Sequence, residues 1–319
     1  MRRILFGANV PQVGSDYDTV KRAVLECEKH GFDFVWIADH FQDTTPSRPY
    51  LECWTTLSAL AAETKRIRLS TVLVNNLFRH PSLLAKMSST LDVISRGRLN
   101  LGIGAGWYSE ECNSFGVPFP KPLERIQRLE ESFEIVKRLW TQDTVTFQGK
   151  YYSLKDAVLE PKPVQKPHPP IWTGIMYGKR RMLNVIAKHA DLWTISSLYL
   201  PTPKEHQEMK KALDEACRTV GRDPNQIQQA LGIGCVIAED EPRLREKAER
   251  FKPISLNVKD YSTKQMRLEG TPQQLIEKLR AYTSVGVTCF VMNFPDVATL
   301  EPVRLFSEKV MPAFRGETC

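Results

Sequence analysis

The chain alternates between short apolar runs and longer stretches in which apolar residues recur at helical spacing. The short runs predict β-strands at 4–10, 32–38, 67–74, 98–104, 171–173, 192–195, 230–238 and 288–293. The longer stretches predict helices at 18–30, 54–63, 81–94, 123–140, about 179–188, 205–220, about 242–251 and 272–285, and a closing helix that ends near 314. The clearest cap signal is at Thr271 and Gln274, which form a capping box with Pro272 at the first helical position.

Apolar strands that alternate with helices predict a parallel sheet with both faces covered. Because eight such strands are predicted, we expect an α/β fold of the closed TIM (β/α)8 type, formed by 1–319 as one domain. Insertions interrupt the rhythm at about 141–170 and 252–270. The first of them contains a predicted hairpin at 144–152 and a proline-rich connector at 161–170.

The composition is that of a soluble globular protein, with 42% apolar and 25% charged residues. The 44 basic and 37 acidic residues are mostly interleaved, which argues against a nucleic-acid partner. The net charge of +7 would suit an anionic cofactor. The seven cysteines form no CxxC pair, and neither a signal peptide nor an 18-residue apolar run is present. No zinc-binding pattern and no GxSxG nucleophile motif is present. We expect a cytoplasmic enzyme without a metal or a membrane partner.

Polar side chains follow two of the predicted strands, where the active site of a barrel lies. Asp39 and His40 come directly after the second strand, so they could bind a cofactor and move a proton. The alternative is that Asp39 caps a turn and His40 packs on a loop. Asn75 and Asn76 follow the third strand, and they could hydrogen-bond a planar ligand or form a turn.

Two predicted helix starts carry basic residues. Arg79 and His80 precede the helix at 81, and we favour a structural role for them as a cap or an ion pair. The fifth strand runs into Gly174–Gly178 and then into Lys179 and two arginines, a pattern that suits a phosphate at a helix N-terminus. The alternative is a solvated helix end.

The fourth strand ends in the sequence LGIGAGW. Its small residues, including Ala105 and Gly106, would let the backbone approach a flat ligand. The spacing is not GxGxxG, so a Rossmann site is not predicted, and a tight turn is the alternative.

Taken together, these motifs resemble the luciferase-like monooxygenase family, and more closely its branch that uses the deazaflavin coenzyme F420. The matching stretches are GFDFVWIADHF, FRHP, LAKMSSTLDVISRGRLNLGIGAGW, ERIQRLEESFEIVKRLW, VTFQGKYY, EPKPVQKPHPPIW and AKHADLW, with looser matches at EGTPQQLIEKL and GVTCFVMNFP. The order of these motifs is highly specific for the family and less specific for the cofactor.

The resemblance implies a cofactor ring over the strand ends, with Asp39 and His40 beside it. It also implies a non-prolyl cis peptide at about Val72–Leu73, under the ring. The other implied contacts are Asn75 from strand three, Ala105 and Gly106 beside the ring, and the phosphate loop Gly174, Met176, Tyr177 and Gly178.

Two departures from the family pattern bear on activity. Trp107 stands where a sugar dehydrogenase branch has a catalytic glutamate, which argues against the same substrate chemistry. The phosphate loop reads GIMYG rather than a run of glycines, which could alter the phosphate contacts.

We therefore expect hydride transfer between coenzyme F420 and a small organic substrate, with Asp39 holding the cofactor and His40 as acid or base. Trp107, Phe41 and Trp193 could line the site or belong to the core. The alternatives are an FMN-dependent monooxygenase and a non-catalytic flavin-binding protein. The resemblance also implies a homodimer.

Overall fold

The computed structural model describes residues 2–43, 48–175, 180–195, 200–252 and 267–316. Within these ranges, no helix is long and apolar enough to cross a membrane. Met176, Tyr177 and Gly178 of the predicted phosphate loop lie outside the described residues, as does most of the second predicted insertion.

Eight parallel strands close into a barrel, which confirms the predicted fold class. In spatial order they are β1 (Leu5–Asn9), β2 (Phe34–Ile37), β3 (Arg68–Thr71), β5 (Leu99–Gly104), β8 (Ile171–Ile175), β9 (Leu192–Ile195), β10 (Gln228–Ile237) and β12 (Cys289–Asn293). The barrel closes where β12 pairs with β1, from Cys289 opposite Leu5 to Met292 opposite Ala8.

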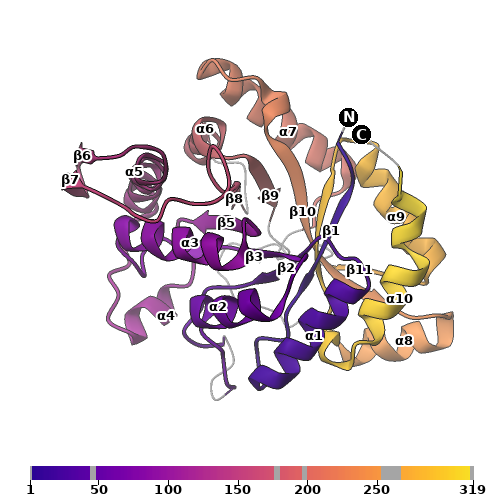
Figure 1. The fold of residues 1–319 in the computed structure, drawn as a ribbon. Coiled ribbons are helices and arrows are strands. Elements are labelled where there is room, and N and C mark those ends of the chain that lie inside the picture. Colours follow the sequence, from indigo (N-terminus) through magenta and orange to yellow (C-terminus); the bar gives the residue numbers. More distant parts are fainter. Residues whose placement is uncertain (1, 44–47, 176–179, 196–199, 253–266, 317–319) are drawn as a thin grey trace.

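Helices surround the barrel on its outside (Figure 1). They are α1 (Tyr17–Lys29), α2 (Cys53–Glu63), α3 (Pro81–Ser95), α5 (Pro122–Thr141), α6 (Arg180–His189), α7 (Pro203–Thr219), α8 (Glu241–Arg250), α9 (Pro272–Thr283) and α10 (Glu301–Lys309). The capping box predicted at Thr271 is present and opens α9. Three short 3-10 helices are also present: η1 (Pro224–Gln226), η2 (Val297–Thr299) and η3 (Met311–Phe314). The last of them, η3, ends where the closing helix was expected to end.

Three local predictions need correction. The third strand is not continuous, because a cis peptide at Val72–Leu73 separates β3 from β4 (Val74–Asn75), which pairs with β5. The stretch predicted as the insertion 252–270 ends in a strand, β11 (Arg267–Gly270), which pairs in parallel with β10. The predicted hairpin is present as β6 (Val145–Gln148) and β7 (Ser153–Ala157), so it extends beyond 152.

A further helix, α4 (Ser109–Ser114), follows β5 and was not predicted. Its six residues are too few for apolar periodicity to identify a helix.

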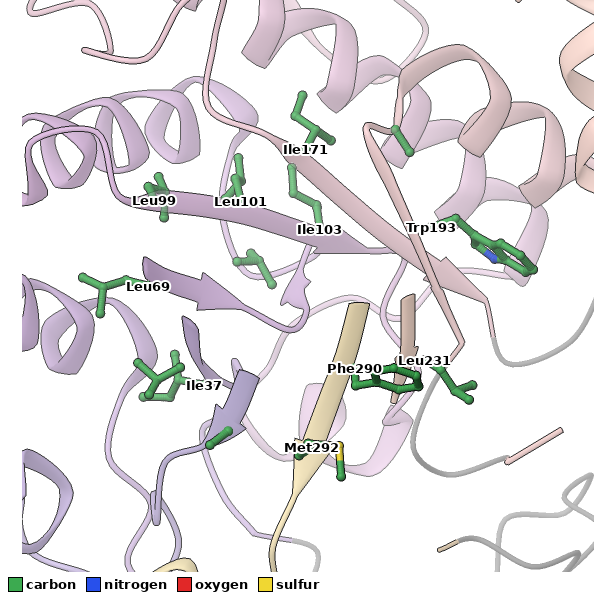
Figure 2. Packing of buried hydrophobic residues seen from close by; sticks show 14 of the residues in the cluster. Ile37, Leu69, Leu99, Leu101, Ile103, Ile171, Trp193, Leu231, Phe290 and Met292 are labelled. Carbon is green, nitrogen blue, oxygen red and sulfur yellow. The ribbon is translucent and has the colours of Figure 1, made fainter. Parts of the chain in front are cut away.

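Apolar side chains pack on both sides of the barrel wall. On the outer side, residues such as Ile37, Leu101 and Phe290 pack under the helices (Figure 2). Because side chains alternate along a strand, their neighbours face the barrel interior. There Phe34 and Trp172 pack edge to face, with ring centroids 5.1 Å apart.

The barrel interior is filled by side chains around Phe34 and Trp172. It is more accessible at the carboxyl ends of the strands. At that end the inward positions of four strands are partly exposed: Asn9, Gly104, Gly174 and Asn293. The functional site is therefore expected at the carboxyl ends of the strands, as in other barrels of this type.

Gly102 of β5 lies directly against the backbone where β3 ends. Its N–H donates to the Thr71 hydroxyl at 2.8 Å, and a Cβ at this position would overlap the Thr71 carbonyl oxygen. We predict that Gly102→Ala lowers the free energy of unfolding by about 2–3 kcal/mol, because an overpacked side chain must displace main chain.

The matched control is Gly116→Ala. Gly116 has no atom within 4 Å of an added Cβ, but its φ of +69° makes alanine cost about 1 kcal/mol. Urea unfolding of both variants separates the steric cost from the conformational one. Equal losses would contradict the prediction.

Candidate functional site

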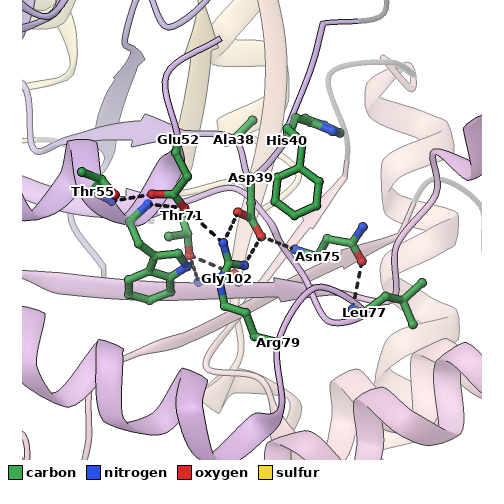
Figure 3. Close-up of polar contacts among 12 residues, drawn as sticks. Ala38, Asp39, His40, Glu52, Thr55, Thr71, Asn75, Leu77, Arg79 and Gly102 are labelled. Atoms are coloured by element: carbon green, nitrogen blue, oxygen red, sulfur yellow. Dashed lines mark hydrogen bonds and ion pairs between the residues drawn. The ribbon is translucent and has the colours of Figure 1, made fainter. Parts of the chain in front are cut away.

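Asp39, the second residue after β2, forms a buried ion pair with Arg79 (Figure 3). The two guanidinium nitrogens donate to Oδ2 at 2.6 Å and to Oδ1 at 2.8 Å. The Asn75 N–H also donates to Oδ2, at 3.0 Å. Asp39 is 3% exposed. Its hydrogen bonds join the end of β2 to β4 and to the turn before α3. The predicted structural role of Arg79 as an ion-pair partner is confirmed.

Glu52 extends this ion pair to α2. Its Oε1 lies 3.1 Å from the Arg79 guanidinium, and its carboxylate also caps α2 by accepting from the N–H groups of Trp54 and Thr55. Burial opposes the charged form, but these N–H groups and the guanidinium outweigh it and lower the pKa of Glu52. For Arg79, burial is likewise outweighed by the carboxylates, which raise its pKa.

His40 points away from this ion pair (Figure 3) and contacts another carboxylate. Its Nδ1 lies 2.8 Å from Oε2 of Glu111, a side chain on α4 that is fully buried. The other oxygen of Glu111 accepts from the N–H groups of Phe41 at 2.6 Å and Gln42 at 3.2 Å. Glu111 thus holds both the imidazole and the backbone that carries it.

Glu111 is the functional residue that the sequence analysis missed. It lies 71 residues from His40 on a six-residue helix, so no local pattern links the two side chains. The available signal was the pair of acidic residues, Glu110 and Glu111, shortly after the glycine-rich end of β5, at the carboxyl end of the barrel.

Aromatic rings surround the other sides of His40. The centroids of Trp107, Tyr50 and Tyr108 lie 5.8, 5.9 and 6.3 Å from the imidazole centroid, all edge to face. Trp107 therefore lies beside His40, which agrees with the first of its two predicted alternatives, lining the site or packing in the core.

The other two aromatic candidates lie elsewhere. Phe41 packs against Phe78, with ring centroids 4.1 Å apart, and against Phe115. Trp193 is fully buried in the outer core, where it packs on His206 of α7. Its role is core packing.

The polar residues at the end of β4 and directly after it differ in their hydrogen bonds. The side-chain oxygen of Asn75 accepts from the Leu77 N–H at 3.1 Å, so Asn75 closes its own turn. The Asn76 N–H donates to the Gly104 carbonyl, but neither polar atom of its buried side chain has a partner in the described structure. His80 is the N-cap of α3 and accepts from the Ser82 N–H, which confirms its predicted role as a cap.

An apolar surface lies between β4 and the end of β5. The side chain of Leu73, in the cis peptide with Val72, packs against Gly104: a Cβ there would lie 3.2 Å from Leu73 Cδ1. Gly106 has a φ of +83°, and a Cβ on it would lie 2.7 Å from the Asn75 side-chain oxygen. These contacts bring Val72, Leu73, Asn75 and the segment of Ala105 and Gly106 together.

The structure places part of the predicted phosphate loop. Gly174 lies near the end of β8, where a Cβ would meet the Thr194 carbonyl oxygen of the neighbouring strand. Among the described residues, no group of three or more His, Cys, Asp or Glu side chains could hold a metal ion.

Comparison with known proteins decides the family. The luciferase-like monooxygenase family model matches residues 4–263. The chain belongs to this family. The resemblance found in the sequence is therefore confirmed.

Relatives within the luciferase-like monooxygenases use different cofactors. The F420-dependent glucose-6-phosphate dehydrogenase of Kineococcus radiotolerans is 28% identical over 320 residues, which cover 91% of each chain. The FMNH(2)-dependent dimethylsulfone monooxygenase of Pseudomonas putida is 25% identical and covers 94% of this chain and 88% of its own. A solved F420-dependent secondary alcohol dehydrogenase, bound to an F420–acetone adduct, has a TM-score of 0.82 over 98% of this chain and 100% of its own. At 22% identity, that likeness shows the shared fold.

The ion pair predicts a specific stability effect. We expect Arg79→Met to lower the free energy of unfolding by about 3–5 kcal/mol, because it leaves the Asp39 carboxylate buried without its cation. Adding Asp39→Asn in the same chain should recover part of this loss, because the orphaned charge is then removed. Urea unfolding measures all three proteins.

Arg218→Met serves as the control, since Arg218 pairs with Glu215 through side chains that are 63% and 68% exposed. Its cost should stay below about 1 kcal/mol. A double variant less stable than Arg79→Met alone would contradict the explanation.

Proposed function

We propose that the protein transfers a hydride between coenzyme F420 and a small organic substrate, with His40 as the acid or base. The F420-dependent dehydrogenases among its relatives support the cofactor. The main support for the proposal is the position of His40, which is held by a buried carboxylate at the carboxyl ends of the strands. Enzymes of this fold have their active sites at this end of the barrel.

The residues present fit a flat, polar-edged cofactor. The surface formed by Val72, Leu73 and Ala105 is apolar and partly exposed, which suits a ring system. Asn76 offers a buried amide whose donor and acceptor are both unpartnered, and such groups are uncommon unless something binds them.

We propose a set of cofactor contacts on this basis. The ring would lie against Val72, Leu73, Asn75, Ala105 and Gly106, and the phosphate would lie at Gly174, Met176, Tyr177 and Gly178. Asp39 would contribute by fixing the strand ends under the ring, because both of its oxygens already accept N–H groups.

In the proposed reaction, His40 takes or returns the proton. When bound, F420 supplies the carbon that accepts or gives the hydride. In alcohol oxidation the substrate C–H bond gives its electron pair away as hydride, and the hydroxyl proton passes to Nε2 of His40. In the reverse direction His40 returns that proton to the carbonyl oxygen. The rings of Tyr50, Trp107 and Tyr108 limit the access of water to this step.

Trp107 affects the choice of substrate. A tryptophan cannot act as an acid, and the buried carboxylate of Glu111 lies behind His40 instead. We therefore favour a substrate that needs one acid–base group, such as a small secondary alcohol or its ketone, over a sugar phosphate.

The test is turnover of F420 with a panel of alcohols, ketones and a sugar phosphate, followed by the visible absorbance of the deazaflavin. We expect His40→Asn to lower kcat by about 10²–10⁴-fold, because a general acid–base contributes this much. The Kd for F420 should stay within about threefold, because the asparagine leaves the apolar surface intact. An unchanged kcat would remove His40 from the mechanism.

An FMN-dependent monooxygenase is the second candidate, favoured by the similarity to the dimethylsulfone enzyme. Oxygen consumption that depends on reduced FMN would support it. Tight cofactor binding with no turnover on any substrate would support the third possibility, a non-catalytic flavin-binding protein.

We also propose that the protein is a cytoplasmic homodimer. The six described cysteines are free and buried, in keeping with a reducing compartment. Leu83 and Ile94 of α3 are 52% and 44% exposed and, at helical spacing, lie on one side of the helix, which offers an apolar face to a second copy. Sedimentation should show a dimer that Leu83→Glu weakens, whereas a monomeric wild type would contradict this proposal.

A further inference from the structure

We propose that Glu111 is a positioning residue that keeps the neutral imidazole of His40 protonated on Nδ1, so that Nε2 is the atom that exchanges the proton with substrate. This inference rests on the proposed function for its catalytic consequence. Its structural content, the tautomer of one histidine, can be measured without any cofactor.

The hydrogen bonds determine which nitrogen carries the proton. A carboxylate can only accept, so the 2.8 Å contact between Glu111 Oε2 and His40 Nδ1 requires a proton on Nδ1. The neutral ring then carries a lone pair on Nε2, the form that can take a proton from a hydroxyl group.

The second oxygen of Glu111 holds this arrangement in place. Oε1 accepts the N–H groups of Phe41 and Gln42, so three N–H donors converge on a side chain with no exposed surface. Both oxygens of the carboxylate are thereby hydrogen-bonded, which holds the group in one orientation. Because two of the donors belong to the backbone directly after His40, the loop and the ring are held by the same group.

Two other carboxylates at this end of the barrel have other partners. Asp39, its neighbour in sequence, gives both oxygens to Arg79. Glu52 caps α2. Trp107 and Tyr108, which enter α4, flank the imidazole from the same segment that carries Glu111. This segment therefore supplies both the rings beside His40 and the acceptor behind it.

Glu111→Gln is the variant that tests the tautomer. The amide oxygen can still accept from Phe41 and Gln42, whereas the amide NH₂ now faces Nδ1 and donates to it. The proton of the neutral ring must then move to Nε2, and the ring can no longer accept a proton there. We expect kcat with F420 to fall by about 10²–10⁴-fold, the scale on which a wrong histidine tautomer is known to act. KM and the Kd for F420 should change by less than about threefold.

Two further variants distinguish positioning from a general loss of structure. Glu110→Gln changes the exposed neighbour of Glu111 on the same helix, and it should leave kcat unchanged. In a His40→Asn background, Glu111→Gln should cause no additional loss, because Glu111 acts through the imidazole. An equal loss in both backgrounds would overturn the proposal.

The decisive readout is ¹⁵N NMR of the labelled imidazole in the protein without cofactor. In the wild type at a pH where His40 is neutral, the proton should lie on Nδ1, and in Glu111→Gln it should lie on Nε2. A wild-type proton on Nε2 would overturn the inference even if the variant fails to fold. If the tautomer switches as expected but F420 is not turned over, the inference stands and the proposed function fails.

Discussion

The buried ion pair between Asp39 and Arg79 is the contact on which the carboxyl end of the barrel depends. Two charges removed from water are costly unless each finds partners. Here the carboxylate receives two guanidinium N–H groups and the backbone N–H of Asn75, while Glu52 shares the cation. The pair therefore holds the end of β2, the short β4 and the starts of α2 and α3 in a fixed relation.

Two adjacent residues after β2 consequently have different tasks. Asp39 turns toward Arg79 and stabilises the framework, whereas His40 turns the other way and meets Glu111 on α4. Each side chain is held by a charged partner from a distant part of the chain. A framework of this kind holds the imidazole among aromatic rings in a fixed position, which is what proton transfer at a substrate oxygen, coupled to hydride transfer at the attached carbon, requires.

The sequence predicted the barrel because β-strands buried on both faces read as apolar runs, from the first at Leu5–Asn9 to the last at Cys289–Asn293. It also predicted which strand ends carry polar groups, including Asp39 and His40. The break at Val72–Leu73 was expected only from the family resemblance. Local pattern did not reveal Glu111, because its partner lies 71 residues away. It did not reveal β11 either, because the four residues RLEG include only one apolar side chain. Long-range hydrogen bonds leave no periodic trace in a sequence.

The proposed hydride transfer depends on which cofactor the carboxyl end of the barrel accepts. The most direct measurement is a pair of fluorescence titrations of the purified protein, one with coenzyme F420 and one with FMN, under the same buffer and salt. We predict clear preference for F420. Preference for FMN would contradict the hydride-transfer account in favour of oxygen chemistry, and binding of neither would show that this family member has lost its cofactor site.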